Sequence, residues 1–328
     1  MLTEEKNEIL GVSVERINDS AIAGFTRQKN QYADDYTVHF VSKFSKPIGA
    51  IDAWGTQRDL TPLWTLLSPK QVNSWVNALL TLPDRSGWIP EAPAGLEYAP
   101  VMGAQYHNAL IVSSYQREIR NFDAQKAWRA IRHNLTTPGA THPCGGYADN
   151  RLLGVYNQYG FVPDEDGAVS NTLEHAYDDC VAAQFTRALD KTADDGFVTK
   201  RPQNYRNIFD PTTKFMCRKH RDSTWLAGFD PFQFGTTGGW NGPGYMEGNA
   251  WLFTFFVPHD VPGLIGLLGR DLFNQRLGEG LEKDYVDFGN QPNLQTPFLF
   301  NYSGKSWLTQ KYSRLVPEKF YNTSPYQG

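Results

Sequence analysis

The spacing of apolar residues after Ser68 constrains the fold of this chain more than any other feature. Ser68, Pro69 and Gln71 form a helix-start pattern: a capping hydroxyl, proline at the first helical position, and glutamine three residues after the cap. The apolar residues that follow fall on one helical face: Val72, Trp75, Val76, Leu79 and Leu80. This spacing predicts an amphipathic helix that packs against other helices.

The same spacing predicts more helices along the chain. The clearest covers 170–190, where one stripe collects Leu173, Ala176, Tyr177, Cys180, Val181, Phe185 and Ala188. We also expect helices over 102–119, 123–134, 194–208, 248–257, 260–269, 270–284 and 306–316. Long loops rich in Gly, Pro and aromatic residues separate them, over 84–101, 138–168 and 218–247. Loops of this length are usually functional, and helical hairpins joined by them are typical of a toroid or a bundle.

The N-terminal segment 12–45 has a different pattern. Residues 37–44 alternate and are rich in β-branched and aromatic side chains, which predicts a strand. Residues 21–26 are a weaker second candidate. Because two strands do not make a stable sheet alone, we expect other strands or the helices to cover them.

Bulk composition narrows the class of protein. With 40% hydrophobic and 20% charged residues, the 328-residue chain can bury a core, either as two domains or as one large helical toroid. A net charge of −4 without a long basic run argues against a nucleic-acid partner. No apolar stretch is long enough to predict a membrane span, and the charged N-terminus is not the start of a signal peptide.

Residues 239–260 contain the candidate catalytic residues. A Gly/Pro-rich loop brings Glu247 among aromatic residues and leads into an apolar run that ends at His259 and Asp260. A carboxyl group beside apolar rings has a raised pKa, so it can stay protonated and act as a general acid. Flat aromatic rings also suit the apolar face of a sugar. Glycoside hydrolysis normally needs a second carboxylate as well.

Six segments together resemble glycoside hydrolase family 92: Thr172–Asp179, Asn204–Pro211, Tyr245–Trp251, Val257–Ile265, Phe288–Pro292 and Phe298–Gly304. The resemblance implies calcium-dependent, inverting exo-α-mannosidases that act on mannose-containing glycans and are often secreted. It also implies an N-terminal β-sandwich packed on a six-hairpin helical toroid. We therefore expect a mainly α fold, with a remnant of the sandwich over 1–49 and an incomplete (α/α)6 toroid over 50–328.

The resemblance also implies site residues. Glu247 matches the general acid of the family, with a solvated loop glutamate as the alternative. The substrate-binding residues that it implies are Trp54, Arg58, Tyr245, Asn249, Trp251, Asn290 and Gln291. His259 and Asp260 fit either this site or a helix N-terminus that Asp260 caps. For Asp178 and Asp179 we favour structural partners over a ligand, because buried acids need partners.

The sequence departs from the family in four places. Gly55 replaces an aspartate that is expected to hold the terminal sugar, and Gln291 replaces a glutamate of the leaving-sugar subsite. Most of the sandwich is missing between Pro47 and Trp54, and the chain stops before the motif that carries the catalytic base. The family implies Ca²⁺, but the remaining motifs yield no ligand set, so calcium binding by this chain is doubtful and its metal ligands are unknown.

These departures lead us to expect impaired catalysis. An inverting glycosidase needs a base on the face of the sugar opposite the acid. The first alternative is an active hydrolase in which Asp178, Asp230 or Asp260 replaces the base. The others are a non-catalytic protein that binds mannose or another glycan, and a degenerate gene product.

Overall fold

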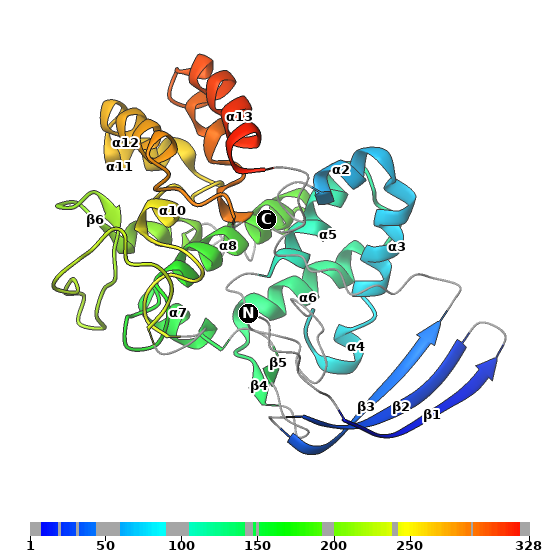
Figure 1. Cartoon of the computed structure of the whole chain (residues 1–328). Helices are drawn as coiled ribbons and strands as arrows, with labels where there is room; N and C mark the ends of the chain where they lie inside the picture. The colour runs from blue at the N-terminus through cyan, green and yellow to red at the C-terminus, as the bar shows by residue number, and fades with distance from the viewer. Residues whose placement is uncertain are drawn as a thin grey trace.

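The computed structural model of the protein describes residues 8–18, 21–30, 33–43, 60–89, 105–141, 147–148, 151–191, 200–237, 242–289 and 291–321. Helices make up most of the described chain, and a separate sheet lies at one end of the molecule (Figure 1). The expectation of a mainly α fold is therefore confirmed. The six-hairpin toroid, the sandwich remnant and the boundary at residue 49 stay predictions.

The sheet is an antiparallel meander of three strands: β1 (Glu8–Asn18), β2 (Ala21–Asn30) and β3 (Ala33–Lys43). The predicted strand at 37–44 falls in β3, and the weaker candidate at 21–26 falls in β2. We did not predict β1 as a strand. It pairs with β2, and the pairing shifts register between Ile9 and Gly11 and again between Arg16 and Asn18.

The first group of helices comprises α2 (Leu60–Leu67), α3 (Pro69–Leu79), α4 (Pro83–Ser86), α5 (Tyr106–Gln116), α6 (Ala124–Thr136), α7 (Leu153–Tyr159) and α8 (Ser170–Ala188). Helix α3 begins with Pro69 as predicted, although the Ser68 side chain makes no capping hydrogen bond. Asp123 caps α6 by accepting a hydrogen bond of 2.8 Å from the backbone nitrogen of Lys126. We did not predict α2 or α7. Between α6 and α7 lie the two-residue strands β4 (Ala140–Thr141) and β5 (Tyr147–Ala148).

A short β-hairpin lies near the start of the second group of helices. The 3-10 helix η2 (Arg201–Ile208) leads into β6 (Phe209–Asp210) and β7 (Phe215–Met216). After it come α10 (Ala250–Thr254), α11 (Val261–Leu268), α12 (Arg270–Glu282), η3 (Gln291–Asn293), η4 (Thr296–Asn301) and α13 (Ser306–Phe320). The helix that we expected over 194–208 is a 3-10 helix in its described part, and the one expected over 248–257 is only five residues long.

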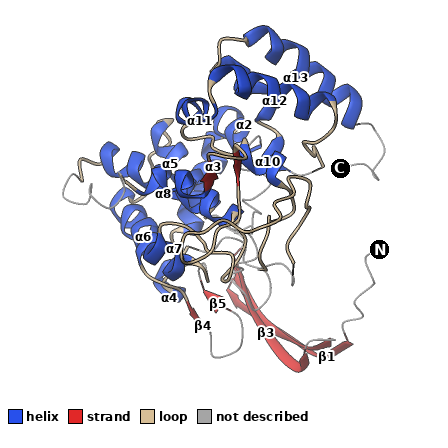
Figure 2. Ribbon diagram, turned by 90° about the vertical axis from the view of Figure 1, so that its left-hand side faces the viewer, coloured by secondary structure: helices blue, strands red, loops and turns tan. Residues whose placement is uncertain are grey.

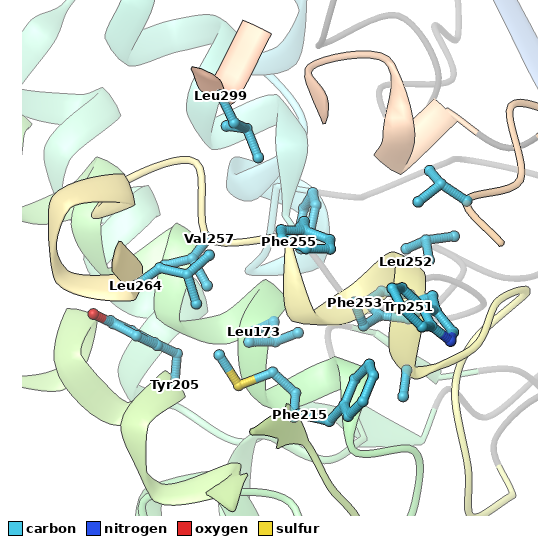
Figure 3. Packing of buried hydrophobic residues seen from close by; sticks show 14 of the residues in the cluster. Leu173, Tyr205, Phe215, Trp251, Leu252, Phe253, Phe255, Val257, Leu264 and Leu299 are labelled. Carbon is cyan, nitrogen blue, oxygen red and sulfur yellow. The ribbon is translucent and has the colours of Figure 1, made fainter. Parts of the chain in front are cut away.

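Helix α8 is shared by two hydrophobic cores. Leu173 and Ala176 near its start pack with α10 to α13, whereas Val181 and Phe185 near its end pack with α3, α5 and α6. Figure 2 shows α12 and α13 on one side of α8 and α6 on the other. Figure 3 shows Leu173 facing the aromatic side chains of α10.

The predicted single stripe on α8 is wrong. Tyr177 and Cys180 are only half-buried and Ala188 is exposed, whereas polar residues of the same helix are buried. The buried polar residues of α8 include Asn171, Glu174, His175, Asp178 and Asp179. The helix is buried on most of its sides because it lies between two cores, so apolar spacing alone could not define its faces. Within the described residues, no helix is both long and apolar enough to cross a membrane.

Candidate active site

The backbone of the loop that carries Glu247 is fixed on two sides. Tyr245 donates its backbone N–H to the carbonyl oxygen of Gly235 at 3.2 Å, and Gly235 donates to that of Gly248 at 2.8 Å. On the other side, the backbone nitrogen of Met246 donates to the hydroxyl of Ser170 at 2.9 Å. The loop is therefore fixed both to the first turn of α8 and to the segment before residue 237.

Glu247 has an uncommon backbone conformation. Its φ is +48°, in the left-handed region that non-glycine residues seldom adopt. A Cβ on the next residue, Gly248, would lie 2.8 Å from Leu252 Cδ1 and 2.9 Å from Phe253 Cε2. The chain therefore passes directly over α10 at this point, and the Glu247 side chain is left half-buried. Strained backbone of this kind concentrates at functional sites.

Tyr245 and Asn249, which flank Glu247 in the sequence, both make hydrogen bonds within the protein. Asn249 caps α10, since its Oδ1 accepts a 3.0 Å hydrogen bond from the backbone nitrogen of Leu252. Tyr245 is 1% exposed, and its hydroxyl donates to the carbonyl oxygen of Met216 at 2.7 Å. The expectation that Tyr245 contacts sugar therefore has no support from this geometry, and its role here is to anchor the loop.

Trp251 lies in an aromatic cluster. Its ring centroid is 5.2 Å from that of Phe215, 4.9 Å from that of Tyr285 and 6.1 Å from that of Phe232. In Figure 3 its indole nitrogen lies on the side of the ring away from Phe253. That N–H has no hydrogen-bond partner in the part of the chain that the structure describes. Trp251 thus has a packed ring and a buried indole N–H that donates to no described residue.

The other predicted substrate-binding residues cannot be placed around Glu247. Trp54, Arg58 and Asn290 lie outside the described residues. Gln291 begins η3, which packs against α10, the helix that carries Trp251. The prediction of a concave site that joins Glu247 to Trp54 and Arg58 stays a prediction.

Asp260 is the N-cap of α11, which decides between the two interpretations that the sequence left open. Its Oδ1 accepts a 2.9 Å hydrogen bond from the backbone nitrogen of Gly263, and its Oδ2 accepts one of 2.7 Å from the hydroxyl of Tyr205. Burial acts to raise the pKa of Asp260, but these hydrogen bonds and one from Gln203 outweigh it and lower the pKa. His259 donates from Nε2 to the carbonyl oxygen of Pro202 at 2.9 Å, and burial lowers the pKa of this histidine.

The acids of α8 have structural partners, as expected. Asp179 is fully buried; its Oδ2 accepts hydrogen bonds from Arg201 Nε at 2.9 Å and from the Tyr156 hydroxyl at 2.7 Å. Burial raises the pKa of Asp179 to about 6, although Arg201 and Tyr156 act in the opposite direction. Asp178 accepts a 2.8 Å hydrogen bond from the backbone nitrogen of Gln105. The sequence does not indicate these partners, because they are distant along the chain.

A second buried polar group lies beside this ion pair. His175 stacks on Tyr156 with ring centroids 4.6 Å apart, and neither ring nitrogen has a partner among the described residues. Burial, and secondarily the positive charge of Arg201, lowers the pKa of His175 to about 3. The side-chain amide of Asn108 is also buried without a partner within the described residues. Buried polar groups of this kind commonly hold internal water.

The described residues do not fit a calcium site. Ca²⁺ takes about six to eight oxygen ligands. No three histidine, cysteine, aspartate or glutamate side chains in the described part of the chain come together in a group that could hold a metal ion. Both oxygens of Asp260 and Oδ2 of Asp179 accept hydrogen bonds from protein donors, and Oδ1 of Asp179 lies 2.8 Å from Arg201 Nη2. We therefore derive no chemical step through calcium.

Comparison with known proteins gives the family. The family model described as the glycosyl hydrolase family 92 catalytic domain matches residues 17–328. The chain belongs to this family.

Individual proteins show a related likeness. A curated relative, described as an uncharacterized secreted glycosidase of Arthroderma benhamiae, is 24% identical in an alignment of 294 positions that covers 80% of this chain and 37% of the relative. The solved structure of a family GH92 inverting mannosidase from Bacteroides thetaiotaomicron is 27% identical, with a TM-score of 0.75 over 87% of this chain and 41% of that one.

A third relative shares the fold at lower identity. This α-mannosidase of family GH92 from Bacteroides thetaiotaomicron, solved in complex with mannoimidazole, is 18% identical with a TM-score of 0.72, covering 96% of this chain and 61% of that one. The chain thus spans between about a third and three fifths of the length of these three proteins.

All three aspartates that we considered as a replacement base in this family 92 chain accept backbone hydrogen bonds. Asp178 and Asp260 hold backbone N–H groups, and Asp260 also holds Tyr205. Asp230 is exposed and accepts a 2.9 Å hydrogen bond from the backbone nitrogen of Phe232. None of these positions identifies a base that faces Glu247.

Proposed function

We propose that this family 92 chain recognises terminal α-linked mannose in glycans, with Glu247 as the carboxyl group that protonates the leaving oxygen. The support is the loop around Glu247: a half-buried glutamate with positive φ, fixed by backbone hydrogen bonds, and adjacent to the α10 aromatic cluster. The inverting mannosidase with a TM-score of 0.75 supports the same class of substrate.

We further propose that hydrolysis by this chain alone is impaired. In an inverting glycosidase, the acid and the base lie on opposite faces of the sugar, with carboxyl groups about 6.5–9.5 Å apart and a water molecule next to the base. Glu247 can supply the acid. The described aspartates at 178 and 260 are bound to other protein groups, so neither is available to activate water. Loss of one acid–base partner costs about 10²–10⁴-fold in rate.

The test is hydrolysis and binding of α-1,2-mannobiose, with and without added Ca²⁺. The chain is compared with Glu247→Gln, which keeps the shape of the side chain, and with Glu318→Gln, which changes an exposed glutamate of α13. We expect binding by calorimetry but turnover near background in all three proteins.

Two results would contradict the proposal at different points. Substantial turnover that Glu247→Gln abolishes and Glu318→Gln preserves would show that another carboxylate acts as the base, so the impairment would be wrong. Absence of mannobiose binding to the unaltered chain would overturn the recognition of mannose itself.

A further inference from the structure

Two phenylalanines are exposed on the segment between β7 and α10, which loops out beside β6 in Figure 1. The Phe232 side chain is 49% exposed and that of Phe234 is 60% exposed. Between them, Gln233 is half-buried. Two large apolar rings on either side of a polar residue give this surface loop an aromatic face that a ligand can cover.

The loop that holds these rings is well fixed by hydrogen bonds. The carboxylate of Asp230 accepts from the backbone nitrogen of Phe232 at 2.9 Å, and Arg218 Nη1 donates to Gln233 Oε1 at 3.4 Å. Arg218 is itself paired with Asp164, through Nε to Oδ1 at 2.5 Å and Nη2 to Oδ2 at 3.1 Å. The rings are thus held in place before any ligand arrives, which lowers the entropy cost of binding.

The rings are connected directly to the candidate active site. Gly235, next to Phe234, donates its backbone N–H to the carbonyl oxygen of Gly248, next to Glu247. The Phe232 ring lies edge-on to Tyr285 with centroids 4.8 Å apart, and it also contacts Trp251. The indole N–H of Trp251 is buried beneath the same cluster. Apolar rings with a few polar groups beside them are the usual composition of a ligand site.

We propose that Phe232 and Phe234 form an aromatic platform beside the Glu247 loop, and that this platform binds a further sugar ring of a mannose-containing chain. The proposal rests on the proposed function, since a glycan must first be the ligand. It deepens that function by making affinity depend on the length of the glycan. A sugar ring presents C–H groups on one face and hydroxyl groups at its edge, so it can cover a phenyl ring while its hydroxyls stay in water.

The size of the platform favours a sugar over a protein. At their exposed fractions, the two rings offer roughly 200 Å² of apolar surface, taking about 200 Å² for a whole phenylalanine side chain. A stable protein–protein interface needs about 800 Å² from each partner. One or two sugar rings match the smaller area.

The experiment measures binding of methyl α-mannoside, α-1,2-mannobiose and an α-linked mannotriose by calorimetry. The proteins are the unaltered chain, Phe232→Ala, Phe234→Ala and the matched control Phe298→Ala, whose side chain is also 49% exposed but lies on η4. Because the three phenylalanines are on the surface, thermal melting should show that all variants fold. We expect mannotriose to bind about threefold to tenfold more weakly for each ring removed from the platform. Binding of methyl α-mannoside and the Phe298→Ala control should be unchanged.

The outcomes separate this proposal from the one on which it rests. If the unaltered chain binds mannotriose and both platform variants bind it equally well, the platform is wrong and mannose recognition stands. If the unaltered chain binds no mannoside, mannose recognition fails and the platform fails with it. If the platform variants change a dimer into a monomer on gel filtration without changing sugar affinity, the rings serve self-association and the proposal is overturned.

Discussion

Arg201 meets Asp179 along the edge of its guanidinium group: Nε donates to Oδ2 at 2.9 Å, and Nη2 lies 2.8 Å from Oδ1. The carboxylate is fully buried and the arginine side chain is 13% exposed. Of these two contacts, the one through Nε is a charge-assisted hydrogen bond, and the one through Nη2 adds the attraction of opposite charges. The pair joins η2 to α8 at the centre of the molecule.

Removing one partner of this pair should destabilise the protein strongly. Arg201→Met leaves the buried Asp179 without its counter-charge, so we expect the free energy of unfolding to fall by about 3–5 kcal/mol. Glu279→Gln is the control, because it breaks an exposed pair with Lys283 on α12 and should cost less than about 0.5 kcal/mol. Urea denaturation measures both. Equal, small changes in the two variants would show that the buried pair does not hold η2 to α8.

His175 should make the protein sensitive to acid. Its pKa is about 3 in the folded chain against 6.5 for the ordinary side chain, so below pH 6.5 the unfolded chain binds a proton that the folded chain does not. The resulting stability is complete above pH 6.5 and is lost as the pH falls toward 3, reaching a loss of about 3 kcal/mol at pH 4. Asp179, whose pKa is raised to about 6, has the opposite effect between its ordinary pKa and pH 6.

His175→Phe isolates the histidine from that opposing effect, since Asp179 is present in both proteins. Phenylalanine keeps the stacking on Tyr156 and removes two buried nitrogens that have no partner among the described residues. We expect the variant to match or exceed the unaltered chain in stability at pH 7 and to lose less on acidification. If the unfolding free energies of the two proteins change in parallel between pH 4 and pH 7, His175 is not a buried neutral histidine.

Gly248→Ala should disturb the Glu247 loop. The new Cβ would come within 2.8 Å of Leu252 and 2.9 Å of Phe253, and overpacking of this kind costs about 1–3 kcal/mol. Gly266→Ala is the control: nothing lies within 4 Å of a Cβ built there in α11, so it should stabilise the protein by up to about 1 kcal/mol. Thermal melting gives the sign of each change. A stabilising Gly248→Ala would mean that the loop does not pass so closely over α10.

We expect substitution of Asp260 to change the stability of the protein and not its binding of mannosides. Asp260→Ala removes the cap of α11 and the acceptor of the Tyr205 hydroxyl, so we expect a loss of about 2–3 kcal/mol. Asp123→Ala removes only the cap of α6 and should cost about 1 kcal/mol. Asp260→Asn keeps an oxygen for the cap and should keep mannoside binding. Loss of binding in Asp260→Asn with unchanged stability would return Asp260 to the active site.

The features predicted correctly from sequence depend on residues close together in the chain. Pro69 can begin a helix because its ring fixes φ and its missing N–H is not needed there. The cap by Asp260, which reaches Gly263 only three residues away, was one of two alternatives that the sequence left open. By contrast, Asp179 and Arg201 are 22 residues apart, so nothing local indicates their pairing. The faces of α8 were mistaken for the same reason, because burial between two cores depends on distant segments.

In the candidate site, too, local features could be predicted from the sequence and distant contacts could not. Glu247 is identifiable from its motif, and the cap by Asn249 is a local interaction. A motif does not say which way a side chain points, so the hydrogen bond from the Tyr245 hydroxyl to Met216 could not be predicted, and contact of Tyr245 with sugar stays a prediction. The exposure of Phe232 and Phe234 also has no local signal, since the same residues in a loop can equally well be buried.

The position of α8 between the two cores has a consequence for how the protein unfolds. Its first half is buried with α10 to α13 and its second half with α3, α5 and α6, so opening either core exposes one half of the helix to water. Independent melting of the two sides would therefore remove half of the packing of α8, next to the Asp179 ion pair that joins its middle to η2. The backbone amides of α8 should therefore exchange with deuterium only when the whole cooperative unit unfolds.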